Sequence, residues 1–277
     1  MKIQKIHTRN ATFQKFIVLK TNRYKRHKYG EFFVEGVNNI NEAIDMKWKV
    51  VSFIYSFEKT LSNWAQNCLK TIPAIINYEL PNHLMDELSG KDESSELLAV
   101  IQMNPKDEMN QNISQKSPIF VLFDRPSNKG NLGSVLRSCD CFGIDELVIT
   151  GHSVDIYDPD VIVSSMGAFF RTPFLQLSDN ISIDNYIVNL KTQYPELVII
   201  GTTPHEQRRI SELDFTTPLL LLLGNETDGL NHYLSEKSDY MATIPMNEYS
   251  PTKSLNVSCA ASILFYEIIR QRTYVIV

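Results

Sequence analysis

The sequence predicts a protein of two α/β domains, and three observations lead to this fold class. With 277 residues the chain is long enough for two ordinary domains, each with its own core. Short apolar runs typical of strands alternate with helical patterns along its length, as in proteins that pack helices on sheets. A polar segment at residues 104–117 interrupts this alternation. The expected domains are therefore residues 1–103 and 118–277, joined by this linker.

Residues 1–103 are expected to form a small α/β sandwich. Apolar runs predict strands at residues 31–35, 50–55, 74–77 and 97–102. Helical patterns between them predict helices at residues 38–47, 58–69 and 81–88.

Residues 118–277 are expected to contain a mostly parallel sheet with helices on both faces. Near-continuous apolar runs indicate strands that are buried on both sides, at residues 119–123, 147–150, 174–177, 197–202, 219–223 and 241–244. A helix is expected at residues 132–142, closed by Gly143, and the last helix is expected to open within residues 254–261.

Composition places few limits on function. An apolar fraction of 43% and a charged fraction of 21% are ordinary for a globular protein. No apolar run approaches the length of a membrane span, and the first residues lack the apolar core of a signal peptide, so we expect a cytoplasmic protein. The four cysteines are expected to be reduced thiols, because Cys139 and Cys141 have no second pair with which to hold zinc.

The net charge of −5 conceals a strong asymmetry. Residues 1–30 carry nine Lys or Arg side chains and no Asp or Glu. Within this stretch, residues 20–30 interleave cations with two tyrosines, a composition that suits phosphates and unpaired bases. The alternative is a solvated, lysine-rich helix end. The candidate RNA-binding residues are Lys20, Arg23, Lys25, Arg26 and Lys28.

The segment Asp124–Arg137 lies between an expected strand and an expected helix. It contains Ser127, Asn128, Gly130 and Asn131, and open α/β sheets place their ligands at such junctions. Only Gly130 and Gly133 are present where a dinucleotide-binding fingerprint would need three spaced glycines. This argues against a dehydrogenase and against the common class of methyltransferase.

Two further polar loops follow strand-like runs later in the chain. Leu219–Leu223 leads into Gly-Asn-Glu-Thr-Asp-Gly at residues 224–229. Ile244-Pro-Met246 is followed by Ser254-Leu-Asn-Val-Ser at the start of the last helix. Together with Asp124–Arg137, these segments resemble the three signatures of the SpoU (TrmH) family of RNA ribose 2′-O-methyltransferases, in order, over roughly residues 118–268. This family belongs to the knotted SPOUT class of S-adenosylmethionine enzymes.

The resemblance implies a fold and a cofactor. It implies a deep trefoil knot in the C-terminal domain, which periodicity and composition cannot predict. It also implies S-adenosylmethionine as cofactor, no metal, and an N-terminal RNA-binding domain like ribosomal protein L30e. Finally it implies a homodimer whose active site is completed across a two-fold interface. Residues 260–277 are apolar around most of the last helix, which agrees with a second covering surface. A symmetric copy is the simplest cover, and the alternative is the N-terminal domain of the same chain.

The resemblance also implies the site residues. The candidate catalytic residues are Asn131, Arg137, Glu226, Ser254 and Asn256. Arg137 is expected to help activate the 2′-hydroxyl or to bind the adjacent phosphate and the developing alkoxide. The candidate cofactor-binding residues are Thr202, Thr203, Gly224, Asn225, Ile244, Met246 and Leu255. Simple helix capping is the alternative for Ser254 and Asn256, and an exposed capping carboxylate is the alternative for Glu226.

The expected function is methyl transfer to the ribose 2′-oxygen of one nucleotide in structured RNA. Ribosomal RNA is favoured over transfer RNA, because the N-terminal domain is sizeable. Methylation of an RNA base and RNA binding without catalysis are the alternatives. The loop at residues 247–253 is longer than in most members of the family, which leaves the placement of Glu248 and Lys253 open.

Overall fold

The computed structural model describes residues 2–103, 116–205, 208–252 and 254–273. The chain forms two compact units. One comprises Met1–Pro105 together with Asp155–Arg171, and the other comprises Lys106–Val154 and Thr172–Val277. The division expected from the sequence did not anticipate that residues 155–171 group with the N-terminal unit. Most of the expected linker lies outside the described residues.

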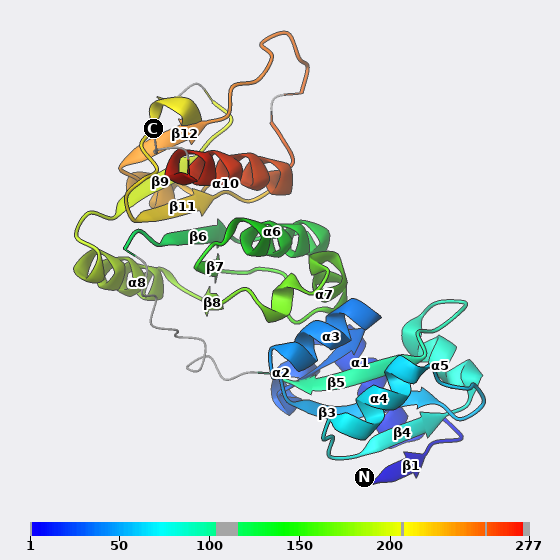
Figure 1. The fold of residues 1–277 in the computed structure, drawn as a ribbon. Helices are drawn as coiled ribbons and strands as arrows, with labels where there is room; N and C mark the ends of the chain where they lie inside the picture. Colours follow the sequence, from blue (N-terminus) through cyan, green and yellow to red (C-terminus); the bar gives the residue numbers. More distant parts are fainter. Residues whose placement is uncertain (1, 104–115, 206–207, 253, 274–277) are drawn as a thin grey trace. The chain divides into compact units, whose positions relative to one another are not determined.

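The N-terminal unit is built on a five-stranded sheet (Figure 1). Its strand order is β1-β4-β3-β5-β2, in which β5 runs antiparallel to both of its neighbours. The strands are β1 (Ile3–Lys5), β2 (Glu31–Glu35), β3 (Val50–Ser56), β4 (Asn77–Leu80) and β5 (Leu97–Gln102). The helices of residues 1–103 are α1 (Ala11–Thr21), α2 (Arg23–Tyr29), α3 (Val37–Asp45), α4 (Asn63–Thr71) and α5 (Asn82–Ser89).

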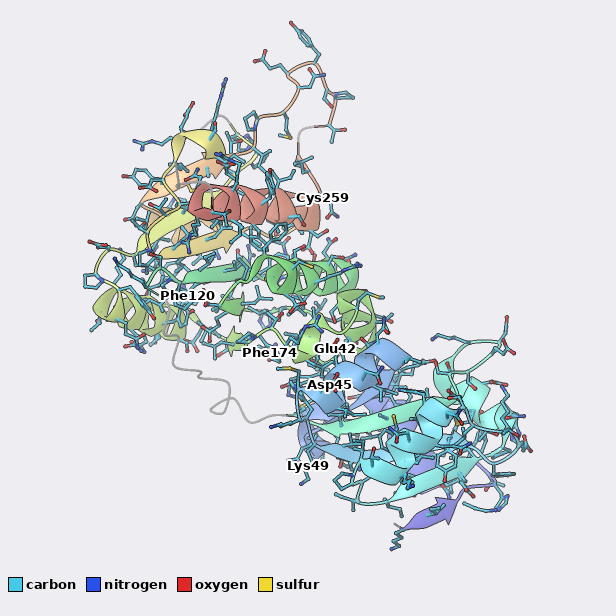
Figure 2. All side chains as sticks on the ribbon, in the orientation of Figure 1. Glu42, Asp45, Lys49, Phe120, Phe174 and Cys259 are labelled. Carbon is cyan, nitrogen blue, oxygen red and sulfur yellow. The ribbon has the colours of Figure 1, made fainter. Side chains whose placement is uncertain are left out.

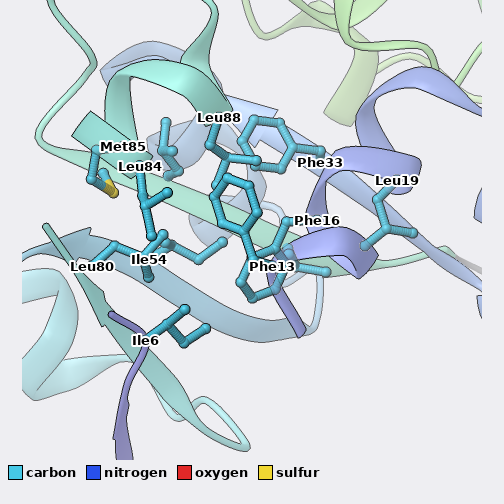
Figure 3. Close-up of a cluster of buried hydrophobic side chains, with 12 residues drawn as sticks. Ile6, Phe13, Phe16, Leu19, Phe33, Ile54, Leu80, Leu84, Met85 and Leu88 are labelled. Carbon is cyan, nitrogen blue, oxygen red and sulfur yellow. The ribbon is translucent and has the colours of Figure 1, made fainter. Parts of the chain in front are cut away.

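A core of aromatic and aliphatic side chains joins α1 and α5 to this sheet (Figure 3). Phe13, Phe16 and Leu19 come from α1, and Leu84 and Leu88 come from α5. Asn22 separates α1 from α2 and caps the second helix, because its side chain accepts a hydrogen bond from the Lys25 N–H at 3.0 Å.

The fourth strand begins at Asn77, not at residue 74 as the apolar run predicted. The buried side chain of Asn77 accepts a hydrogen bond from the Phe53 N–H at 3.0 Å, and its own N–H bonds the Lys2 carbonyl at 2.9 Å. Ile75, within the expected strand, is 63% exposed. The hydrogen bonds of Asn77 therefore place this strand at Asn77–Leu80 and not in the apolar run at residues 74–77.

Residues 155–171 are held in the N-terminal unit by a buried arginine. Arg26 on α2 is 1% exposed, and its Nε donates to Asp155 Oδ2 at 2.7 Å while its Nη2 donates to Asp158 Oδ2 at 3.2 Å. Its Nη1 donates to the carbonyls of Leu19 and Lys20 at 3.1 and 3.0 Å. Four of the five guanidinium N–H groups thus form hydrogen bonds, which compensates for the loss of water.

Aromatic packing completes the attachment of this segment, which contains α7 (Pro159–Ser165) and η2 (Ala168–Phe170). The Trp48 indole N–H donates to the Phe170 carbonyl at 3.2 Å. The Phe32 ring lies 5.1 Å from the Tyr157 ring and 5.6 Å from the Phe169 ring, measured between centroids. Glu42 on α3, labelled in Figure 2, pairs with Arg171.

The C-terminal unit contains a seven-stranded parallel sheet flanked by helices, which confirms the expected sheet and adds one short strand to the six that were predicted (Figure 1). The strand order is β10-β12-β9-β11-β6-β7-β8. The strands are β6 (Ile119–Asp124), β7 (Glu146–Thr150), β8 (Phe174–Leu177), β9 (Val198–Thr202), β10 (Arg208–Arg209), β11 (Leu219–Leu223) and β12 (Tyr240–Thr243). The trefoil knot stays a prediction.

The helices of this unit are α6 (Lys129–Phe142), α8 (Asn180–Gln193), α9 (His232–Glu236) and α10 (Val257–Thr273), with a short η3 at Ile210–Glu212. Apolar residues of α8 pack on Phe120 and Leu122 of β6, and Figure 2 marks Phe120. Helices α6 and α10 pack together, where the Ser138 and Ser262 hydroxyls lie 2.8 Å apart. In the described part of the chain, no helix combines the length and apolar character needed to span a bilayer.

Candidate functional site

The carboxyl ends of β9, β11 and β6 meet at one edge of the parallel sheet. The registers place Leu222 of β11 beside Gly201 of β9, and Leu223 of β11 beside Phe123 of β6. The polar loops that follow these strands therefore emerge together. This is the edge at which open α/β sheets bind ligands.

The loop after β11 is closed on itself. Asn225 and Gly229 exchange two backbone hydrogen bonds of 2.9 and 3.0 Å. A Cβ atom on Gly224 would lie 2.3 Å from the Leu230 nitrogen and 2.4 Å from the Gly229 carbonyl carbon. Only glycine fits at position 224, because the other side of the loop passes so close.

Glu226 projects from this loop onto the start of α6. Its carboxylate accepts hydrogen bonds from the Ser127 N–H at 3.0 Å, the Ser127 hydroxyl at 2.9 Å and the Asn128 N–H at 3.2 Å. It also accepts one from Asn131 Nδ2 at 3.1 Å. Burial opposes the charge of Glu226, but these hydrogen bonds outweigh it and lower the pKa of the carboxyl group. The positive end of the α6 dipole favours the same charge.

Asn131 connects Glu226 to the last helix. Its Oδ1 accepts a hydrogen bond from Asn256 Nδ2 at 3.0 Å. Asn256 also caps α10, because its Oδ1 accepts from the Ser258 N–H at 2.9 Å. Asn256 thus caps α10 through its Oδ1 and contacts Asn131 through its Nδ2, so the capping and site interpretations are compatible. Three expected catalytic residues, Glu226, Asn131 and Asn256, form one hydrogen-bonded chain.

Arg137 and Ser254, the other two candidate catalytic residues, lie outside this chain. Arg137 is exposed on α6, about 9 Å along the helix axis from Asn131. Ser254 is exposed just before α10. Within the described ranges, neither side chain forms a hydrogen bond or ion pair, so both stay available to a ligand.

The candidate cofactor-binding residues follow three neighbouring strands. Thr202, Gly224 and Ile244 lie at or just beyond the ends of β9, β11 and β12. The Thr202 hydroxyl is used internally, because it donates to the Leu222 carbonyl at 2.8 Å. The Thr203 Oγ1 accepts from the His205 N–H at 3.2 Å, and the Asn225 Nδ2 donates to the Arg125 carbonyl at 2.6 Å.

These residues suit a nucleoside-bearing cofactor. Ile244 and Met246 are half-buried and Leu255 is 40% exposed, so all three residues offer apolar surface of the kind on which an adenine ring packs. Gly224 leaves the strand end free of a side chain. The side chains of Thr202 and Asn225 stabilise the loops through their hydrogen bonds to the Leu222 and Arg125 carbonyls.

Sequence reasoning missed Asp124, Arg125 and Asn231. Asp124 is 1% exposed at the end of β6, and its carboxylate accepts hydrogen bonds from Arg125, Thr150 and Asn231. It thereby connects β6, β7 and the loop after β11. An aspartate that ends a run of five apolar residues was the available signal.

The candidate RNA-binding residues of the N-terminal unit fall into two groups. Arg23 and Lys28 are exposed on α2, and Lys25 is half-buried. Arg26 is buried by Asp155 and Asp158, so the expectation that it contacts RNA was wrong. Lys20 is half-buried and donates to the carbonyls of Leu88 and Ser89, the former at 3.0 Å. Helical spacing could have separated Arg26 from Lys28, two residues away on the opposite side of α2, but not from Arg23, three residues away on the same side.

The cysteines are free thiols in the described residues. Cys68 and Cys139 are buried, whereas Cys141 and Cys259, the latter marked in Figure 2, are exposed. Burial raises the pKa of the Cys139 thiol, which keeps it protonated.

Comparisons with known proteins agree with this geometry. The model of the SpoU rRNA methylase family matches residues 118–266, more than half of the chain, and that of the SpoU L30e-like domain matches residues 10–99. A 23S rRNA (uridine(2479)-2′-O)-methyltransferase of Streptomyces viridochromogenes is 37% identical over 270 residues, which are 97% of this chain and 93% of that protein.

Solved structures show the same likeness. The SpoU methyltransferase AviRb from Streptomyces viridochromogenes, in complex with the cofactor AdoMet, superposes with a TM-score of 0.89 and 36% identity, over 96% of this chain and 99% of that one. A structure described as an RNA 2′-O ribose methyltransferase superposes with a TM-score of 0.78 and 26% identity, over 97% and 99% of the two chains. The chain therefore belongs to the SpoU rRNA methylase family.

Proposed function

We propose that this protein transfers a methyl group from S-adenosylmethionine to the 2′-oxygen of one ribose in 23S ribosomal RNA. The observation that carries the proposal is the hydrogen-bonded chain Glu226–Asn131–Asn256. It draws the three polar loops of the family into one site at the carboxyl edge of the sheet. Named relatives of this chain methylate ribose 2′-oxygens of 23S rRNA, which supports ribosomal over transfer RNA.

The cofactor is held by the strand ends. When bound, S-adenosylmethionine supplies an activated methyl group. Gly224 and Asn225 after β11, together with Ile244 and Met246 after β12, offer backbone groups to it, and Leu255 packs on its adenine ring. Thr202 and Thr203 support this rim through their hydrogen bonds to neighbouring backbone.

Asn131 is placed to position the acceptor ribose. A carboxamide has two N–H donors and two acceptor lone pairs. Glu226 occupies one donor of Asn131, and Asn256 occupies one lone pair. One donor and one lone pair therefore remain for a ribose hydroxyl. Because both neighbours fix the amide plane, the ribose is oriented without ordering a loose side chain.

Arg137 supplies the positive charge that the reaction needs. A guanidinium stays protonated, so its natural role is to bind a phosphate and to stabilise the oxyanion that develops on the 2′-oxygen. Ser254 has an exposed hydroxyl at the start of α10 beside Asn256, where it can accept a hydrogen bond from the ribose hydroxyl and relay the released proton to solvent.

A homodimer is part of the proposal. The buried face of α10 carries Ala261, Leu264 and Phe265, but Ile263 and Tyr266 are 39% and 58% exposed on its other side. A symmetric copy is the simplest cover for that apolar surface. The terminal residues 274–277, which were part of this expectation, lie outside the described residues. We place the enzyme in the cytoplasm, where its RNA substrate is found.

Methyl transfer from radiolabelled S-adenosylmethionine tests the proposal. Full-length protein is incubated with unmodified 23S rRNA or with bulk transfer RNA, in the presence of a metal chelator. We expect label in the 23S rRNA alone and no effect of the chelator. Label in transfer RNA alone would overturn the substrate class, and no label in either RNA would overturn the activity.

A further inference from the structure

Arg125 has an unusual backbone conformation at the carboxyl edge of the parallel sheet. It follows β6 directly and has a φ of +47°, in the left-handed region that side-chain-bearing residues seldom adopt. Such conformations concentrate at functional sites because the surroundings must enforce them. Its carbonyl accepts the hydrogen bond from Asn225 Nδ2 at 2.6 Å. Arg125 and Asn131 therefore flank the same pair, Asn225 and Glu226.

The guanidinium of Arg125 is held in one orientation. Its Nε donates to Asp124 Oδ1 at 3.0 Å and its Nη2 donates to Asp124 Oδ2 at 2.9 Å. The Asp124 side chain is 1% exposed, whereas that of Arg125 is 35% exposed. A Cβ atom on Gly151 would lie 2.9 Å from Arg125 Cγ, so the glycine leaves room for the arginine. The positive charge of Arg125 is therefore held in a fixed position by the buried Asp124 carboxylate.

The Asp124 carboxylate does not depend on Arg125 for its hydrogen bonds. Asp124 also accepts from the Thr150 hydroxyl at 3.1 Å and from the N–H and Nδ2 of Asn231 at 3.2 and 3.0 Å. Three donors would still satisfy the carboxylate if Arg125 were absent. Asp124 therefore fixes the orientation of the Arg125 guanidinium, but its own carboxylate keeps enough hydrogen bonds without Arg125.

Part of the guanidinium is unused. Two of its five N–H groups bind Asp124, and the other three have no partner among the residues that the structure describes. The acidic neighbour whose charge acts on Arg125 besides Asp124 is Asp228, in the loop after β11. In a chain with a net charge of −5, cations at this edge are needed to admit RNA.

We infer that Arg125, oriented by Asp124, binds a backbone phosphate of the substrate RNA beside the target ribose. The inference rests on the proposed function, because it takes RNA as the ligand. A planar, pre-oriented guanidinium matches the geometry of a phosphate and loses little freedom on binding. The phosphate contact fixes the register of the RNA strand on the protein, so that Asn131 contacts the ribose of one nucleotide only.

Arg125→Gln in the full-length protein is the main test. Glutamine keeps a hydrogen-bonding side chain beside Asp124 but removes the charge. The affinity for unmodified 23S rRNA should fall by about tenfold, the effect of one lost charge-assisted contact. The log–log slope of RNA affinity against salt should lose about 0.7 to 0.9. Affinity for S-adenosylmethionine, measured by calorimetry, should not change.

Two further variants control the test. Arg125→Lys keeps the cation but not the fork, so it should restore the salt slope and only part of the affinity. It also serves if Arg125→Gln does not fold. Arg270→Gln is the matched control, because Arg270 pairs with Glu267 in the same two-bonded manner on α10. It should leave RNA affinity and salt slope as they are.

The outcomes separate this inference from the proposed function. An unchanged salt slope in Arg125→Gln would overturn the inference. So would a loss confined to S-adenosylmethionine affinity, since Arg125 would then bind the cofactor carboxylate. If the wild-type protein itself transferred no methyl group to RNA, the proposed function would fail, whatever Arg125 did.

Discussion

Asn256 donates a hydrogen bond from Nδ2 to Oδ1 of Asn131 across 3.0 Å, although 125 positions separate them in the chain. Asn131 lies in the first turn of α6, and Asn256 caps α10. The contact therefore joins the N-terminal ends of two helices at the edge of the sheet where Glu226 also lies. It makes the geometry of Asn131 depend on a residue from the last helix.

Two substitutions at position 256 separate capping from catalysis. Aspartate caps a helix as well as asparagine does, but it cannot donate to Asn131. Asn256→Asp should therefore melt within a few degrees of the wild type and lose activity by about tenfold or more. Asn256→Ala should lose activity and also about 0.5–2 kcal/mol of stability. Thermal unfolding and initial rates of methyl transfer measure both. A fully active Asn256→Asp enzyme would reduce the contact to a structural one.

Arg137→Ala should abolish most methyl transfer without preventing cofactor binding. Removal of a contact to developing charge typically costs about 10² or more in kcat. Affinity for S-adenosylmethionine should stay within a few-fold, because the exposed Arg137 forms no hydrogen bond or ion pair with the candidate cofactor-binding residues that the structure describes. Arg137→Lys should recover activity only in part. Near-normal turnover of Arg137→Ala would show that this arginine is only a surface residue.

Substitution of Arg26 should reduce stability, whereas substitution of its exposed neighbours on α2 should reduce RNA binding. Arg26→Met leaves Asp155 and Asp158 buried without their cation, so the free energy of unfolding should fall by about 3–5 kcal/mol. Arg23→Ala with Lys28→Ala removes exposed charges, which should change stability by about 0.5 kcal/mol or less. The double variant should instead reduce the salt slope of RNA binding by about 0.7 to 0.9 per contact. Urea unfolding and filter binding at several salt concentrations check the two effects, and an unaltered slope would place RNA recognition elsewhere.

The fold was predictable where strands are buried on both faces. The run at residues 219–223 has no polar residue, and it forms β11 at those bounds in the middle of the parallel sheet. The strand β4 was misplaced because its pairing depends on the buried amide of Asn77, which hydropathy does not register. The grouping of residues 155–171 with the N-terminal unit depends on Arg26 and on Trp48, whose partners lie far along the chain.

In the site too, features that depend on local sequence were predictable, and features that depend on distant partners were not. The proximity of Glu226, Asn131 and Asn256 was predictable because each lies in a recognisable motif at a strand or helix end, whereas their catalytic role stays a prediction. Arg26 was assigned to RNA because a basic stretch reads as exposed, whereas its helix turns one cation inward. Arg125 was missed because its role depends on a buried carboxylate and a left-handed backbone, neither of which composition shows.

Glu226 should make cofactor binding sensitive to acid. Burial opposes its charge, but the hydrogen bonds from Ser127 and Asn131 lower its pKa below the ordinary value of 4.5. A carboxylate with a depressed pKa stabilises the fold above the unfolded-state pKa and loses that contribution as the pH falls through its folded-state pKa. Affinity for S-adenosylmethionine should therefore be constant from neutral pH down to about pH 5 and fall at lower pH. Glu226→Gln should weaken binding at all pH values and remove this dependence, and calorimetry across the range decides; a wild-type affinity that fell already near pH 6 would contradict the assignment.

The most direct test of ribose methylation is the response of the product to alkali. RNA cleaves in alkali because its 2′-hydroxyl attacks the adjacent phosphodiester, and a 2′-O-methyl group prevents this at one bond. Unmodified 23S rRNA treated with the enzyme and S-adenosylmethionine should give a hydrolysis ladder with one missing band, and the Arg137→Ala enzyme should give a complete ladder. A complete ladder from RNA that has nevertheless taken up the methyl group would place that group on a base and contradict the account.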